Sequence, residues 1–197
     1  MGKRFKVAAS DILISNVSIS WCHEIRYLGM YLSASSTFRC NMHFAKVKFF
    51  RSLNGIFGKI GIKSSVNVIL SLVNAYSTPA LLYGVETGCL GSAQIDKLDY
   101  AYNSIFTIIF NTFNRDVIKL CQYYTGHMPL GYTIDLRCLQ FFNAIRSLAS
   151  SPAKLLFLSV GYDEWQTIAD KYGILFCDNP NSFRPKIWSS FESCLVV

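Results

Sequence analysis

Two pairs of cysteine and histidine have the residue types of a zinc site. Cys22 and His23 are adjacent, and Cys40 and His43 are two residues apart, so the four side chains offer sulfur and nitrogen ligands. Adjacent residues are poorly placed to ligate one ion, and the segment between the pairs is predicted to contain a full strand. We therefore expect structural roles for these residues and no bound metal.

A thiol and an imidazole offer a second kind of chemistry. His127 follows Gly126 in a predicted loop, and Cys121 and Asp116 precede it on a predicted helix. A cysteine nucleophile needs its base within hydrogen-bonding reach, and this spacing does not indicate such a geometry. Structural roles are favoured here too, and no catalytic residue is predicted. The aromatic pairs at 123–124 and 141–142 are interpreted as core residues rather than base-stacking platforms.

Positive charge is concentrated in the first third of the chain. Residues 1–63 carry 10 Lys and Arg against 2 acids, a net of +8, whereas residues 64–197 carry 9 against 10, a net of −1. A one-sided excess of this kind indicates a polyanionic partner, most often nucleic acid. Three of these cations share one arc of a predicted helix: Lys48, Arg51 and Lys59. The alternative interpretation of this arc is a solvated helix face.

Composition indicates a folded protein with a large core. Of the 197 residues 51% are hydrophobic and 16% charged, which excludes a disordered chain. The mean hydropathy of +0.28 is high for a free-standing domain, and burial within a larger assembly would explain it. Seven irregularly spaced cysteines without a CxxC motif predict reduced thiols, hence an intracellular protein, cytoplasmic or nuclear. Residues 64–85 are long enough to span a bilayer, but seven polar residues and Pro79 favour a buried helix and no membrane contact.

Hydrophobic periodicity predicts a small β element followed by helices. Residues 11–21 alternate around an Asn turn, which indicates a hairpin, and residues 25–33 are predicted as a third strand. From about Asn41 the period is that of a helix whose core-facing stripe contains Met42, Phe49, Leu53, Ile56 and Ile60. Gly55 and Gly58 are expected to interrupt this helix, and Gly61 to cap it. The segment 58–61 also fits the GxxG loop of KH domains, but a helix end is favoured because the βααβ context is missing.

Later helices are predicted at 65–77, 93–112, 114–124, 132–149 and 163–172. Five prolines are expected to mark the joins: Pro79, Pro129, Pro152, Pro180 and Pro185. A loop and a tail are expected after Cys177. The predicted fold class is α+β, mainly α, with a short N-terminal antiparallel β element followed by a helical bundle.

The first part of the chain contains, in order, three short motifs: residues 2–5 (Gly-Lys-Arg-Phe), 19–21 (Ile-Ser-Trp) and 26–32 (Arg-Tyr-Leu-Gly-Met-Tyr-Leu). They are similar to the end of the palm in one family, the reverse transcriptases of non-LTR (LINE-type) retrotransposons. Residues 46–54 and 58–61 are similar to the start of the thumb. Residues 79–86 match the P-x-L-L-Y-G-x-E segment common in that family, and Leu98-Asp99-Tyr100, Asn103 and Phe106 continue the match. The resemblance covers roughly residues 1–150 and is weaker beyond.

The resemblance implies a division of the chain into three parts. Residues 1–36 correspond to a remnant of the palm, residues 37–125 to a thumb-like helical region, and residues 126–197 to a C-terminal helical extension and tail. The family polymerises DNA with two magnesium ions held by palm aspartates, but this sequence contains no Asp-Asp pair. Because two-metal chemistry needs such carboxylates, no cofactor is expected and the chain as it stands is not expected to be an enzyme.

The resemblance also assigns two sets of binding residues. Tyr27, Leu28 and Gly29 correspond to the primer-side strand. The cations that correspond to the thumb's grip on the duplex backbone are Lys46, Lys48, Arg51, Lys59 and Lys63. The expected function is binding of RNA or RNA–DNA duplex without base specificity, with a separate palm and fingers part as a further partner. The alternatives are a helical protein-interaction or scaffold domain and an inert truncated remnant.

Overall fold

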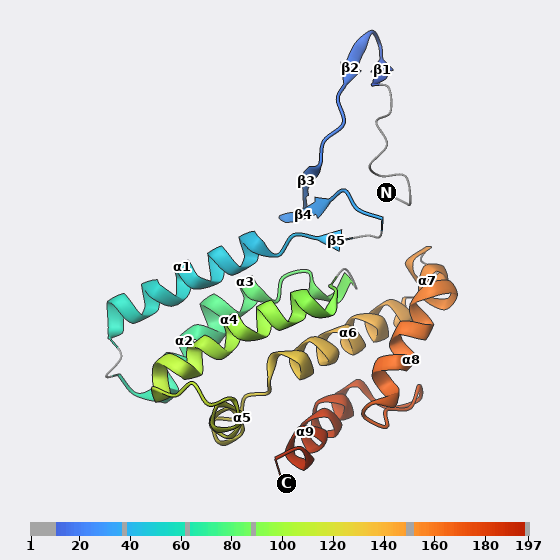
Figure 1. The fold of residues 1–197 in the computed structure, drawn as a ribbon. Coiled ribbons are helices and arrows are strands. Elements are labelled where there is room, and N and C mark those ends of the chain that lie inside the picture. The colour runs from blue at the N-terminus through green and yellow to red at the C-terminus, as the bar shows by residue number, and fades with distance from the viewer. Residues whose placement is uncertain (1–10, 37–38, 62–63, 88–89, 149–151, 196–197) are drawn as a thin grey trace.

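The protein has an α+β fold that is mainly α-helical (Figure 1). The computed structural model describes residues 11–36, 39–61, 64–87, 90–148 and 152–195. Two small antiparallel sheets near the N-terminus precede the helices, as the sequence predicts. Their strands are β1 (Ile12–Ile14), β2 (Val17–Ile19), β3 (Glu24–Tyr27), β4 (Met30–Ser33) and β5 (Arg39–Cys40).

Helices account for most of the remaining described residues. The first of them are α1 (His43–Ile60), α2 (Val66–Leu72), the π-helical η1 (Val73–Ser77), α3 (Thr78–Leu81) and the 3-10 turn η2 (Val85–Thr87). The later ones are α4 (Ser92–Phe110), α5 (Arg115–Tyr124), α6 (Leu130–Ser147), α7 (Pro152–Leu156), η3 (Phe157–Gly161), α8 (Tyr162–Asp170), η4 (Pro180–Ser182) and α9 (Phe183–Ser193).

The first hairpin projects away from the helices (Figure 1). β1 and β2 pair through a two-residue turn at Ser15 and Asn16, both with positive φ, which confirms the hairpin predicted over 11–21. Every residue of the two strands is exposed, and Leu13 has 70% of its surface accessible. This hairpin therefore gains no support from the core, and a two-stranded hairpin that stands alone is only marginally stable.

The second sheet contains a hairpin where a single strand was predicted. β3 and β4 pair around Leu28 and Gly29, so the prediction of one strand over 25–33 is wrong. Both turn residues have positive φ, 45° and 83°, as in the two-residue turns that match strand twist. Leucine rarely adopts that conformation, which is why the sequence did not indicate the turn. β5 adds to β4 on the other side.

Helix α1 packs its apolar stripe onto the rest of the body. Phe49 and Leu53 are fully buried, and α1 lies against η1, α3 and α4. The prediction that Gly55 and Gly58 interrupt the helix is wrong, because the helix continues through both. Glycine weakens a helix by only about 0.5–1 kcal/mol, which the packing of a long apolar face outweighs. Gly61 caps the helix as predicted, donating its N–H to the Phe57 carbonyl.

The segment after α1 is continuously helical, and Pro79 does not break it. η1 is a π-helical turn just before Pro79, which sits in the first turn of α3. The wider turn accommodates a proline that has no N–H to donate to the preceding turn. Val66–Thr87 is the one helical stretch among the described residues that is long and apolar enough to cross a membrane, and 39% of it is buried inside the protein. Ile69, Val73 and Leu81 are buried in the core.

The C-terminal part contains a helix that was not predicted. α9 occupies the segment interpreted as a tail, and it buries residues at four-residue spacing: Phe183, Ile187 and Phe191. Pro185 lies in its first turn, where the N–H has no helical partner, so this proline begins a helix instead of marking a join. Helices α4, α5, α6 and α8 lie within one or two residues of their predicted bounds.

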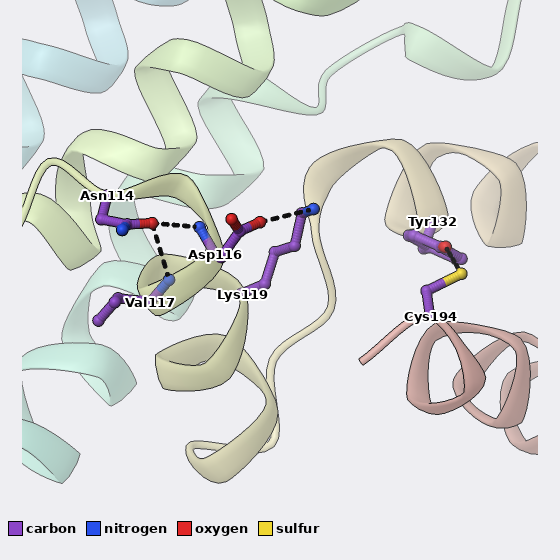
Figure 2. A network of polar contacts seen from close by, with 6 residues as sticks. All are labelled: Asn114, Asp116, Val117, Lys119, Tyr132 and Cys194. Carbon is purple, nitrogen blue, oxygen red and sulfur yellow. Dashed lines mark hydrogen bonds and ion pairs between the residues drawn. The ribbon is translucent and has the colours of Figure 1, made fainter. Parts of the chain in front are cut away.

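Polar contacts fix the ends of several helices (Figure 2). Asn114 caps α5, its side-chain oxygen accepting hydrogen bonds from the N–H groups of Asp116 and Val117 at 2.9 and 3.4 Å. At the far end of the chain the Tyr132 hydroxyl donates to the sulfur of Cys194 at 3.5 Å, which ties α6 to the end of α9. Burial is the main reason that the pKa of Tyr132 rises to about 12.

A polar chain of one buried and two half-buried side chains joins α4 to α5. The side chain of Gln122, 1% exposed, donates to the Asn103 oxygen at 2.8 Å, and Asn103 donates to Asp99 at 2.8 Å. Burial raises the pKa of Asp99 despite these bonds. The family-like residues at 98–106 therefore have a structural task in this fold.

Candidate nucleic-acid interface

The outer face of α1 carries unpaired positive charge. Lys48, Arg51 and Lys59 are exposed, and α1 contains no acidic residue. In the part of the chain that the structure describes, none of these three cations is in an ion pair. The ion pairs that do occur there all lie beyond residue 85: Glu86–Arg137, Asp116–Lys119, Asp135–Lys171 and Asp178–Lys186.

The predicted cations do not all share this face. At the helical spacing of about 100° per residue, Lys46 lies on the opposite flank of the apolar stripe from Lys48 and Lys59. It lines a shallow hollow together with Gln94 and Lys97 of α4. Lys63 falls outside the described residues. The face that presents cations together is thus formed by three of the five residues named from the sequence.

Two glycines open the middle of the same face. Gly55 and Gly58 are both exposed, and a Cβ added at either position would meet no atom within 4 Å. Nothing inside the protein requires glycine there. The result is a stretch of bare helix backbone between Arg51 and Lys59, which a large partner can approach closely.

The primer-side residues form the tip of the β3–β4 hairpin. Tyr27 and Leu28 are largely exposed, and Gly29 packs against the ring of Tyr83. The Tyr83 hydroxyl donates a 2.7 Å hydrogen bond to the Leu28 carbonyl. The positive φ of Leu28 is therefore held by a contact from a residue 55 positions away, which the sequence alone did not reveal.

The segment 79–86 connects the hairpin to the helices. Gly84 has a φ of +74°, and a Cβ at this position would collide with the sulfur of Met30. Glu86 accepts a 2.5 Å hydrogen bond from Arg137 of α6. Leu81 is fully buried in the core, whereas Tyr83 and Gly84 contact the β3–β4 hairpin. The segment therefore attaches this hairpin to the helices.

A hollow of about 340 Å³ lies where the hairpin meets α1. The predicted residues Gly29 and Lys48 both line it, so the structure brings the two predicted sets together at this point. The walls also include Tyr31, Phe44 and Tyr83, which the sequence analysis did not single out as site residues. Tyr31 and Tyr83 lie inside the family-like segments 26–32 and 79–86, which is the signal that could have found them.

The other candidate chemistries have no support in the geometry. Across the described ranges, no three His, Cys, Asp or Glu side chains are grouped to hold a metal. The nitrogens of His127 contact the Asn74 amide at 2.7 Å and the Thr125 carbonyl at 2.8 Å, and its ring packs edge-on to Phe106. Burial lowers the pKa of His127 and raises that of Cys121, as expected for a structural imidazole and an inert thiol. Tyr124 and Phe141 are 81% and 39% exposed, so their prediction as core residues is wrong.

Comparison with known proteins does not show which family the chain belongs to. No family model, curated protein or solved structure matches it. The resemblance to LINE-type reverse transcriptases and the three-part division of the chain both stay predictions from the sequence. The function must therefore be argued from the charges and surfaces described above.

Proposed function

We propose that this chain binds RNA or RNA–DNA duplex through the outer face of α1, without reading base sequence. In this proposal it acts as the thumb-like part of a retrotransposon-type reverse transcriptase and performs no chemistry of its own. The observation that carries the proposal is the row of exposed, unpaired cations at Lys48, Arg51 and Lys59 on a helix without acids.

The physical support is electrostatic. Flexible cations on a rigid helix neutralise phosphates along a backbone and release their counterions, which gives affinity without sequence readout. The bare backbone at Gly55 and Gly58 allows the phosphates to approach between the cations. By contrast, four of the nine lysines and arginines beyond residue 63 have an acidic partner within the fold: Lys119, Arg137, Lys171 and Lys186.

We infer from the sequence that the chain performs no polymerase chemistry of its own. The chain has no Asp-Asp pair, and a two-metal site needs carboxylates that hold both ions. A separate palm and fingers part would have to supply the chemistry. In this proposal the chain binds no metal, contacts no membrane and is located inside the cell.

The test is the binding of a labelled RNA–DNA duplex measured over a salt series. Affinity should fall by about a hundredfold between 50 and 200 mM salt if about four phosphates are neutralised. The triple variant Lys48→Gln, Arg51→Gln, Lys59→Gln should lose most of the binding, and its salt slope should drop by about 0.9 for each cation removed. A flat salt response, or full binding by the triple variant, would contradict the proposal.

Two controls distinguish an effect of the cations on the outer face of α1 from an effect of net charge alone. The variant Lys119→Gln, Lys154→Gln, Arg184→Gln removes the same charge from the later helices and should bind almost as the unmodified protein does. Lys46→Gln, on the other flank of α1, should have a smaller effect than Lys48→Gln. Circular dichroism should show equal helicity in all variants, because none of these side chains is buried.

One observation favours a second candidate, a protein-interaction domain. β1 and β2 expose apolar residues on both faces, and β3 is exposed along its whole length. Exposed apolar strands of this kind are typical of surfaces that pair with another chain. The salt series distinguishes the two functions, since a domain that binds only protein would give no salt-dependent duplex binding.

A further inference from the structure

A ladder of cations and aromatic rings runs from the second hairpin onto α1. The Arg26 guanidinium of β3 lies 6.0 Å from the ring centroid of Tyr31 in β4. Tyr31 stacks on Phe44 of α1, with centroids 3.8 Å apart and planes inclined by 17°. Lys48 follows Phe44 by one helical turn, on the same side of α1. We refer to Arg26, Tyr31, Phe44 and Lys48 as the aromatic ledge.

The ledge borders the hollow between the hairpin and α1. Tyr31, Phe44 and Lys48 all line this space, and its remaining walls are mostly apolar, including Met30, Met42, Pro79 and Ala80. Lys48 is the only charged residue among the described residues that line it. The volume of about 340 Å³ is at the small end of the range for ligand sites.

The polar groups around the hollow are mostly engaged elsewhere. The Tyr83 hydroxyl donates to Leu28, and the Asn41 side chain donates to Glu24 and accepts from the His43 N–H. Glu24 accepts the hydrogen bond from Asn41 and is therefore already engaged. Lys48 and the Tyr31 hydroxyl are therefore the side-chain groups that remain to meet a ligand, and Lys48 selects an anion.

Flat apolar walls beside a single cation fit a ligand that has a flat ring and, next to the ring, a negatively charged group. A paired nucleotide cannot use such walls, because its base is stacked within the duplex. An unpaired nucleotide presents both parts, a base with an open π-face and a phosphate beside it. Phe44 offers such a face, since 39% of its surface is accessible although it stacks on Tyr31.

We propose that the aromatic ledge binds one unpaired nucleotide of a strand whose paired part lies on α1. The base stacks against Phe44 and Tyr31, and the phosphate contacts Lys48. This inference rests on the proposed function and narrows it, because the preferred ligand becomes a duplex with a single-stranded extension rather than a blunt one.

The first experiment compares a blunt RNA–DNA duplex with the same duplex carrying three unpaired nucleotides at either end. The unmodified protein should bind one of the extended duplexes about tenfold more tightly, as expected for one stacked base. Phe44→Ala should abolish this preference and leave blunt-duplex affinity unchanged. Val47→Ala is the matched control, since Val47 is 40% exposed on the same helix and does not line the hollow.

A second variant and a second ligand identify the stacking itself. Phe44→Leu keeps an apolar side chain against Tyr31 and should still lose the preference, because leucine has no aromatic face. An extension of abasic units keeps the phosphates and should bind no better than the blunt duplex. Equal binding of blunt and extended duplexes, or a preference that the abasic extension retains, would overturn the inference while leaving the proposed function intact.

A direct signal tests the ledge even if duplex binding fails. A short single strand with 2-aminopurine at its centre should lose fluorescence on binding, and Phe44→Ala should restore the fluorescence. No change in that signal with the unmodified protein would overturn the inference. Loss of salt-dependent duplex binding together with a retained signal would instead overturn the proposed function alone.

Discussion

The charges of α1 and the charges of the later helices are arranged in opposite ways. Lys48 and Arg51 point into solvent without acidic partners, whereas Arg137 and Lys186 hold Glu86 and Asp178 at 2.5 and 2.6 Å. The hydrogen bond from Lys186 keeps the pKa of Asp178 below its usual value. The later helices therefore satisfy part of their charge within the fold, while the three cations on the outer face of α1 have no acidic partner there.

This difference is sharpest across the two faces of α1 itself. Phe49→Ala should lower the free energy of unfolding by about 3–5 kcal/mol, because its side chain is fully buried. Arg51→Ala, two residues further on, should change it by less than about 0.5 kcal/mol, as expected for an exposed residue without a partner. Urea denaturation measures both values. A large loss of stability in the Arg51 variant would mean that the cations serve the fold after all.

A second test concerns the polar chain of the later helices. Asn103→Ala should cost about 2–3 kcal/mol, because it leaves Gln122 and Asp99 without their partner in the core. Lys59→Ala is the comparison on α1 and should cost almost nothing. Equal effects of the two substitutions would remove the contrast between the regions.

The pH dependence of stability should come from the later helices as well. Burial, and to a smaller extent Arg184, lowers the pKa of His127, so the unfolded chain takes up a proton first as the pH falls. Stability should therefore drop as the pH falls below about 6.5, toward the lower pKa of the folded state. Thermal unfolding at pH 7.5 and pH 5.5 measures this loss. His127→Gln should flatten the profile in this range.

The smallest expected effect is a gain. Gly55→Ala and Gly58→Ala should each raise the free energy of unfolding by about 0.5–1 kcal/mol, because the added methyl meets no neighbour and alanine favours the helix. The same substitutions should weaken duplex binding if phosphates approach the bare backbone. Gly131→Ala in α6 is the matched control: its Cβ also meets nothing, and it should stabilise without affecting binding.

The sequence predicted those parts of the fold that depend on near neighbours. The apolar stripe of α1 could be predicted because Phe49, Leu53 and Ile60 repeat with the helical period. α9 was missed although Phe183, Ile187 and Phe191 repeat in the same way, because Pro185 was interpreted as a break. Its position in the first turn, where no N–H is needed, explains the error.

The candidate site was less predictable because its parts meet across long stretches of sequence. Lys48 and Arg51 were visible as a charged arc. The contact of Tyr83 with Leu28, 55 residues apart, and the stacking of Tyr31 on Phe44 depend on how the hairpin docks. A periodic pattern contains no information on such docking, so the hollow between the hairpin and α1 emerges only from the folded chain.

The packing of α1 also sets an order of events during synthesis on the ribosome. The buried face of α1 is covered by η1, α3 and α4, which end about 50 residues further along the chain. At about 5–20 residues per second, Phe49 and Leu53 stay uncovered for roughly 3–10 s after α1 emerges. The β1–β2 hairpin, by contrast, is exposed along both strands in the folded structure. The apolar residues of this hairpin therefore remain open to association after the buried face of α1 has been covered.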